Sequence, residues 1–156
     1  MMLVIFYILL GIQSGVPAVE ETYLKRTAAS WSSDLQHQDA KTRRAAAFAM
    51  GKLGKHALPY ISTLKTLLQQ DQEVSVRSAA LFRWVSWDRW QHGDIAPVVI
   101  QSFEKETQLP VRRALALTLG KVAEQAGSAE PLLRKALVDH DAVLRQNAAW
   151  SLGQLG

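Results

Sequence analysis

Small and apolar residues recur at helical spacing in stretches that each follow an arginine, and a second kind of apolar stripe follows a proline. The first stretch contains Ala45, Ala46, Ala49, Met50 and Leu53. Alanine is the best helix former, and this spacing places the residues along one side of a helix. The stripes of the second kind begin after Pro59, Pro97 and Pro131. Because proline suits the first helical turn, where its missing N–H has no intrahelical partner, the pattern predicts pairs of helices.

These helix pairs repeat at a nearly constant interval. The arginines that precede the first helix of each pair are separated by 34, 35 and 33 residues. They are Arg43, Arg77, Arg112 and Arg145. A fixed period in this range is typical of stacked repeat proteins, so we predict an all-α fold, an α-solenoid of stacked antiparallel helix pairs. Function in such folds usually lies on an extended surface rather than in one pocket.

The period divides the chain into units of about 39–70, 71–106 and 107–138, with a partial unit at each end, 20–38 and 139–156. In the leading unit we expect one helix face to carry Leu24, Ala28, Trp31 and Leu35. Glycine segments are expected to end the first helices. They are Gly51 to Gly54, Gly120 to Ala123 and Gly153 to Gly156. Since a second helix should follow Gly156, we expect either a fragment of a longer protein or a last helix that pairs with something else.

The first twelve residues contain no charged side chain. This run is shorter than the ~20 apolar residues of a bilayer span, but it suits the hydrophobic region of a secretory signal. Val16-Pro17-Ala18 follows with small residues typical of a cleavage site, although no Lys or Arg precedes the run. We therefore predict a signal peptide over residues 1–18 and an extracytoplasmic location, periplasmic or secreted. A membrane anchor is the alternative.

One motif recurs at the start of the units: acid-x-x-Val-Arg-x-Ala-Ala-x-x-Ala-Leu-Gly-x-Leu-Gly. It matches best in Asp39 to Gly54 and Asp141 to Gly156, well in Pro110 to Ala123, and only at its start in Glu73 to Ser86. This motif resembles the HEAT-like repeat of the phycobilisome-lyase type, and the resemblance covers about residues 20–156. It implies stacked helix pairs but no particular activity, because the family includes adaptor-like binding modules, bilin lyases and the di-iron enzyme deoxyhypusine hydroxylase.

The resemblance also implies a role for the repeated arginine and acid, which tend to bond within and between units of such repeats. We assign this role to the four arginines above and to acids four positions ahead of them. These acids are Asp39, Glu73 and Asp141, while Gln108 stands at this place in the third unit. We expect an ion-pair ladder that sets the geometry of the repeats, with ligand binding as the alternative. Each exposed pair would contribute only ~0–1 kcal/mol, so the apolar stripes should supply most of the stability.

The chain offers no recognisable catalytic constellation. It has no cysteine, which excludes disulfides and thiolate chemistry. A di-iron site of the hydroxylase kind would require repeated His-Glu dipeptides, whereas each histidine here precedes another residue. The dipeptides are His37-Gln38, His56-Ala57, His92-Gly93 and His140-Asp141. Since neither a nucleophile elbow nor a glycine-rich phosphate loop is present, we predict no catalytic residue, no metal, no cofactor and no small-molecule substrate.

The second unit departs from the others where Trp84, Trp87 and Trp90 follow one another at intervals of three residues. From Arg77 to Pro97 this unit is about four residues longer than the first. Trp84 can fill the core position that Met50 has in the first unit, and Trp87 can fill that of Leu53. Trp90 has no core counterpart in the first unit. Tryptophan and arginine are enriched at interface hot spots. The candidate binding residues are therefore Trp87, Arg89 and Trp90.

These observations favour a non-enzymatic protein–protein interaction module or scaffold whose partner is another protein. A bilin-lyase-like or other catalytic role is the alternative, and it rests on the resemblance alone. The net charge is +4, but the basic residues are scattered among acidic ones, so we expect no nucleic acid as partner. A nucleic-acid-binding solenoid would need one continuous basic face made of Arg44, Lys52, Arg113 and Lys121. We expect no membrane contact beyond the signal or anchor segment.

Overall fold

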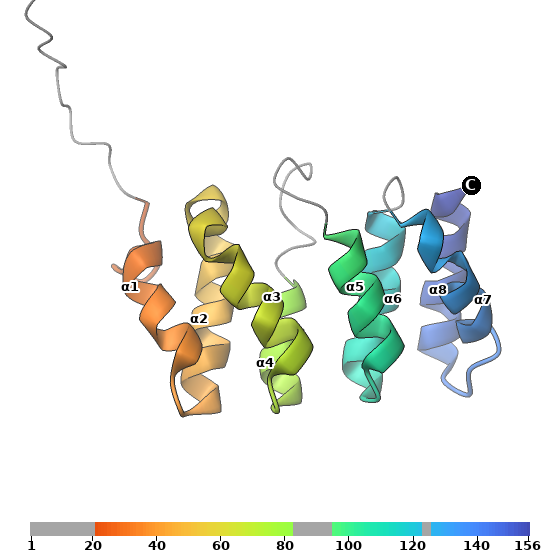
Figure 1. Ribbon diagram of the computed structural model, residues 1–156, viewed down its shortest axis with the longest axis horizontal. Helices are drawn as coiled ribbons and strands as arrows, with labels where there is room; N and C mark the ends of the chain where they lie inside the picture. Colours follow the sequence, from red (N-terminus) through yellow and green to blue (C-terminus); the bar gives the residue numbers. More distant parts are fainter. Residues whose placement is uncertain (1–20, 83–94, 123–125) are drawn as a thin grey trace, which may run out of the picture.

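The computed structural model describes residues 21–82, 95–122 and 126–156. The described residues form helices arranged in two layers, and they contain no strand (Figure 1). One layer contains α1 (Ala28–Ser32), α3 (Ile61–Gln70), α5 (Ala96–Lys105) and α7 (Glu130–Ala136). The layer behind it contains α2 (Ala40–Leu53), α4 (Val74–Phe82), α6 (Leu109–Lys121) and α8 (Ala142–Leu155). The prediction of an all-α solenoid is confirmed.

Contacts between helices run both along the stack and across the two layers. Along the rear layer α2 packs on α4, α4 on α6 and α6 on α8. Across the layers α3 packs on α4, α5 on α6 and α7 on α8, and each of these pairs is joined by a short turn. The largest side chains buried between them are Leu35, Met50, Leu53, Leu68, Leu81, Leu115, Leu119, Leu133 and Leu144. Because burying one such side chain contributes about 1.5–3 kcal/mol, this continuous core holds the stack together.

Local signals in the sequence explain where most helices begin. Asp39 caps α2 by accepting hydrogen bonds from the backbone N–H groups of Lys41 and Thr42, and Asp141 caps α8 through Leu144 N–H. Proline lies in the first turn of α5, α6 and α7. Pro59 differs, because it lies in the 3₁₀ segment Gly54–Tyr60 that precedes α3.

The leading unit is less helical than the sequence pattern suggested. A tight turn runs from Tyr23 to Arg26, in which Leu24 and Lys25 have positive φ, and Leu24 is 70% exposed. Thr27 caps α1, which continues as the 3₁₀ segment Ser33–Gln36. Three of the four expected face residues, Ala28, Trp31 and Leu35, are buried. The helix begins late because the turn is held by Trp31, whose Nε1 donates to the carbonyl of Tyr23.

The glycine segments have two different roles. Gly54, with φ of +57°, follows the last residue of α2 and ends it in a conformation that favours glycine. Gly120 and Gly153 instead lie inside α6 and α8. A Cβ on Gly120 would lie 2.6 Å from the Cα of Ser151, so this glycine marks the close approach of α8 to α6.

Candidate functional site

The repeated arginines reach from the first helix of one unit to the turn that leads into the next. Arg43 donates from Nε and Nη2 to both carboxylate oxygens of Asp71, at 2.7 and 2.9 Å. Arg77 holds Glu106 in the same way, at 2.7 and 3.0 Å. Arg112 and Asp139 form a looser third pair at 3.5 Å. These three pairs, the arginine ladder, connect neighbouring units, and the first two do so through two-donor contacts that are directional as well as charged.

The same groups also organise the turn to which each belongs. Nη1 of Arg77 donates to the carbonyls of Asp71 and Gln72, just ahead of α4. Arg43 and Arg145 make the equivalent bonds in their own turns. Each ladder acid accepts a backbone N–H two residues later, as the Asp71 carboxylate does from Glu73 at 2.9 Å. The ladder therefore fixes both the shape of each turn and its distance from the preceding helix.

The acids of the ladder differ from those that the sequence suggested. Asp39, Glu73 and Asp141 lie four positions before an arginine, whereas the pairing acids lie six positions before one. Asp39 caps α2, and its oxygens bond the start of that helix instead of Arg43. Glu73 is exposed and forms no ion pair with the described residues. Asp39 and Asp141 lie at the N-caps of α2 and α8, where backbone N–H groups donate to their carboxylates.

The turn before α8 shows a further difference from the predicted ladder. Asp141 caps α8 and pairs with Arg113, not with a ladder arginine, through both of its carboxylate oxygens. Glu106 was missed because its unit carries Gln108 at the position that the motif emphasises. Glu106 could have been identified from its position six residues before Arg112. Asp71 and Asp139 lie at the same distance before Arg77 and Arg145.

Burial and pairing act on the ladder carboxylates in opposite directions. Burial acts to raise the pKa of Asp71 and Glu106, whose side chains are 3% and 7% exposed. The bonds from Arg43 and Arg77, helped by backbone N–H donors, outweigh burial and hold both pKa values below the ordinary range. The pKa of Asp141 is lowered to about 2 by Arg113 and then by the N–H of Leu144.

Acid should therefore destabilise the fold. A carboxylate whose pKa is lowered by folding stabilises the folded chain above its unfolded-state pKa, and this contribution disappears as pH falls through the folded-state pKa. For Asp141 the window runs from 3.8 down to about 2. We expect the urea midpoint of unfolding to fall between pH 4 and pH 2. Asp141→Asn, which keeps a good N-cap, should flatten this dependence, and an unchanged slope in that variant would contradict the assignment.

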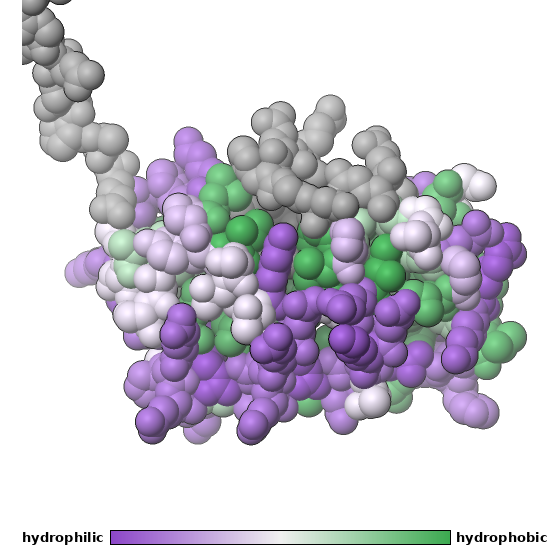
Figure 2. Space-filling view, in the orientation of Figure 1, coloured by the Kyte–Doolittle hydropathy of each residue, from purple (hydrophilic) through white to green (hydrophobic). Residues whose placement is uncertain are grey.

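A polar groove of about 370 Å³ lies beside the ladder, between the C-terminal ends of α3 and α5. The ladder residues Asp71, Arg77 and Glu106 line its inner part. Its other polar lining residues are Gln69, Gln70, Gln101, Ser102, Lys105 and Thr107. The side-chain amide Nε2 of Gln69 donates to the side-chain oxygen Oε1 of Gln101 at 2.6 Å, which links the two helices across the groove. Figure 2 shows hydrophilic residues over the lower middle part of the layer that contains α3 and α5.

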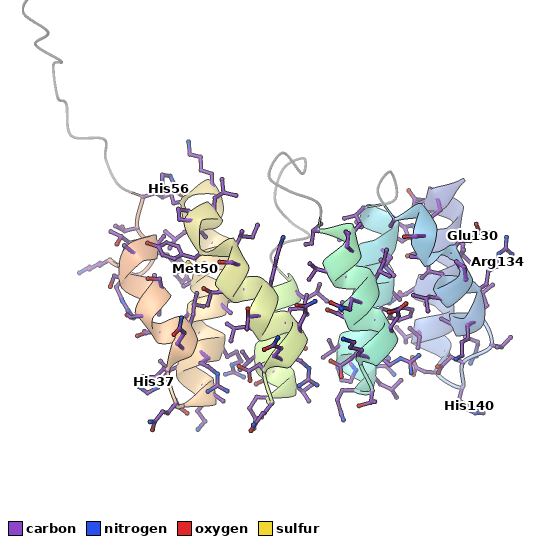
Figure 3. The ribbon with its side chains drawn as sticks, viewed as in Figure 1. His37, Met50, His56, Glu130, Arg134 and His140 are labelled. Carbon is purple, nitrogen blue, oxygen red and sulfur yellow. The ribbon has the colours of Figure 1, made fainter. Side chains whose placement is uncertain are left out.

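The three histidines in the described part of the chain do not gather into a metal site. His37, His56 and His140 lie at three separate corners of the molecule (Figure 3). His37 Nδ1 accepts the backbone N–H of Asp39, and His56 lies 3.2 Å from a carboxylate oxygen of Glu21. In the described ranges no group of three His, Cys, Asp or Glu residues is placed to hold a metal ion.

Two family models match the chain. The model described as PBS lyase HEAT-like repeat matches residues 42–70, and the model described as HEAT repeats matches residues 90–156. The chain is a HEAT-like repeat protein. The first match covers most of α2 and all of α3, and the second contains the pairs α5–α6 and α7–α8. No curated protein sequence matches the chain.

Two predicted features of this HEAT-like repeat protein lie outside the described residues. The candidate binding residues Trp87, Arg89 and Trp90 belong to the segment 83–94, and the predicted signal peptide belongs to residues 1–20. Both stay predictions. Among the helices of the described ranges, none has the length and apolar character needed to cross a membrane.

Proposed function

We propose that this HEAT-like repeat protein is a non-enzymatic interaction module or scaffold, and that the groove between α3 and α5 contacts a protein partner. The proposal rests on the distribution of charge in the groove, where both carboxylates are paired with arginines. The carboxylates of Asp71 and Glu106 are already neutralised by Arg43 and Arg77. Their bonds serve the geometry of the repeat, so the paired groups are poorly suited to acid–base chemistry.

The groove residues that can still contact a partner carry side-chain amides and one positive charge. Lys105 lines the groove and forms no ion pair with the described residues, while Gln69 and Gln101 carry further donors and acceptors. Small-molecule pockets are mostly apolar, with few polar groups. These polar walls favour a polar peptide segment whose amides bond the glutamines and whose carboxylate approaches Lys105. An N-terminal signal would place this module outside the cytoplasm.

The proposal is tested by capturing partners from extracytoplasmic and cytosolic extracts with the full chain, and then measuring the affinity of each captured protein. Gln101→Ala/Lys105→Ala should weaken binding by about tenfold or more, equivalent to about 1.4 kcal/mol. Trp87→Ala/Trp90→Ala tests the predicted tryptophan site separately. The matched control is Lys135→Ala, an exposed lysine on α7. The Gln101/Lys105 variant and the Lys135 control should melt like the original chain, since surface substitutions usually change stability by within ~0.5 kcal/mol. The tryptophan variant is compared only if its melting is also unchanged.

The results distinguish the sites. Loss of binding only in the Gln101/Lys105 variant supports the groove, and loss only in the tryptophan variant moves the site to that cluster. Equal binding by every variant would overturn both sites. A chromophore bound to the purified chain would instead favour the catalytic alternative suggested by the PBS lyase HEAT-like match over residues 42–70.

A further inference from the structure

One side of α2 carries a stripe of exposed cations around an exposed aromatic ring. The residues of this cationic stripe are Lys41, Arg44, Phe48 and Lys52. Because they are three or four positions apart, they lie along one line of the helix. The core residues Met50 and Leu53 lie on the opposite side of α2. The cationic stripe therefore faces away from the layer that contains α1 and α3.

The positive charge of the stripe is not compensated by neighbouring acids. The helices of this layer, α2, α4, α6 and α8, contain no aspartate or glutamate. The side chains of Lys41 and Arg44 form no ion pair with the described residues. Lys52 places its ammonium 5.6 Å from the centre of the Phe48 ring, where it keeps its charge. Asp39, just ahead of the stripe, uses its carboxylate to cap α2.

The exposure of this side of α2 does not result from its place in the stack. The equivalent residues of α6, 69 positions later, are Arg113, Leu117 and Lys121. All three are at least partly exposed, although α6 has α4 on one side and α8 on the other within its layer. These positions therefore face outward from the layer and not along the stack. The cationic stripe lies on the same outward side.

Positive charge is concentrated on α2 and is interrupted farther along this outward side. On α4, Ser78 occupies the position that Arg44 has on α2. On α6, Arg113 donates to both carboxylate oxygens of Asp141, so its charge is already paired. A long nucleic-acid duplex needs a continuous basic face that neutralises many phosphates. Lys41 and Lys52 are 11 positions apart, which is about 16 Å along a helix and suits a short acidic segment.

We infer that the cationic stripe docks a short acidic segment of a partner protein, in which carboxylates flank one apolar side chain. The carboxylates would pair with Lys41, Arg44 and Lys52, and the apolar side chain would contact Phe48, which is 40% exposed. The Phe48 ring is already positioned by an edge contact with Tyr23, with 6.3 Å between ring centres. This surface lies on the layer opposite to the α3–α5 groove, so the inference goes beyond the proposed function and does not depend on it.

The test uses the full chain and a fluorescein-labelled peptide in which one leucine is flanked by glutamates on both sides. The peptide has about eleven residues, enough to cover the stripe as a helix. Fluorescence anisotropy should show binding that weakens as salt is added, because exposed charges are screened. Arg44→Gln/Lys52→Gln should weaken the binding about tenfold, since two exposed ion pairs are lost. The matched control is Lys65→Gln/Lys135→Gln, which removes the same charge from α3 and α7 and should bind like the original chain.

A second pair of measurements examines the apolar contact. Glycine in place of the peptide's leucine should weaken binding to the original chain about fivefold, because the leucine no longer covers the aromatic ring. The same exchange in the peptide should have little effect on binding to Phe48→Gln. Because this comparison changes the peptide and not the protein, a loss of stability in Phe48→Gln cannot imitate the result. An equal effect of the exchange on both proteins would contradict the contact with Phe48.

The inference is overturned if the original chain does not bind the peptide, or if the Lys65/Lys135 control loses as much affinity as the Arg44/Lys52 variant. It is also overturned if Gln101→Ala/Lys105→Ala alone abolishes binding, because the acidic segment would then belong to the α3–α5 groove. A mixed DNA duplex and phosphatidylserine vesicles serve as competitors at the same concentration of negative charge. If either displaces the peptide more effectively than unlabelled peptide does, the occupant is a nucleic acid or a membrane and the inference fails.

Discussion

Replacing Arg77 with alanine should destabilise the fold by about 3 kcal/mol, because it leaves the carboxylate of Glu106 buried without its partner. The Glu106 side chain is 7% exposed and receives two bonds from Arg77. The same substitution removes the bonds from Nη1 to the carbonyls of Asp71 and Gln72. The loss therefore affects both the turn before α4 and the link to the next unit. Urea unfolding followed by circular dichroism measures it.

Two controls show whether the unpaired charge causes this loss. Arg44→Ala removes an exposed arginine from α2 and should change the free energy of unfolding by within about 0.5 kcal/mol. Arg77→Met combined with Glu106→Leu removes both charges and should recover much of the stability, because apolar residues can replace a buried pair. If Arg77→Ala costs no more than Arg44→Ala, the ladder does not hold the units together.

The second large effect is expected at Gly120, where alanine should cost about 2 kcal/mol through overpacking. Its Cβ would lie 2.5 Å from Ser151 Oγ and 2.6 Å from both Ser151 Cα and Trp150 Cζ3. Because Ser151 Cα belongs to the backbone, α8 as a whole must move away from α6. That movement strains two bonds between the helices, from Ser151 Oγ to the Ala116 carbonyl and from Asn147 to the Arg113 carbonyl.

Gly153 provides the matched control for this substitution. It lies inside α8 at the equivalent position, and a Cβ there would meet no atom within 4 Å. Alanine at Gly153 should stabilise the isolated chain by up to about 1 kcal/mol, since glycine is a poor helix former. Thermal melting of the two variants should thus shift in opposite directions. Shifts of the same sign would show that the contact between α6 and α8 tolerates a methyl group.

Much of the fold follows from information that is local in the sequence. The spacing of Ala46, Met50 and Leu53 identifies a helix with one buried side, and all three are indeed buried. The interval of 33 to 35 residues between arginines identifies a stack, because one helix pair cannot bury its apolar side alone. N-caps such as Asp39 satisfy N–H groups two and three residues away, so this information is also local, although the motif led us to assign Asp39 to the ladder instead.

The candidate groove was much less accessible to sequence reasoning. Its lining residues come from three units, and Gln69 meets Gln101 across 32 positions. Glutamines, lysine and threonine at such spacing look like ordinary solvated positions in a helical repeat. Trp87, Arg89 and Trp90 were prominent by composition, but the groove depends on how α3 and α5 are placed beside each other.

The tertiary structure alone decided the acid of each ion pair and the role of each glycine. Arg43 meets Asp71 across 28 positions and Arg77 meets Glu106 across 29, so the correct offset depends on how one unit stacks on the next. The segment Gly120 to Ala123 does contain the end of α6, at Lys121, but only the stacked structure shows that Trp150 and Ser151 occupy the space that a side chain on Gly120 would need. The sequence by itself determined the helices and their repeat, since hydrophobic spacing and capping act within a few residues. Pairing and close approach depend on surfaces that meet only after the units have stacked.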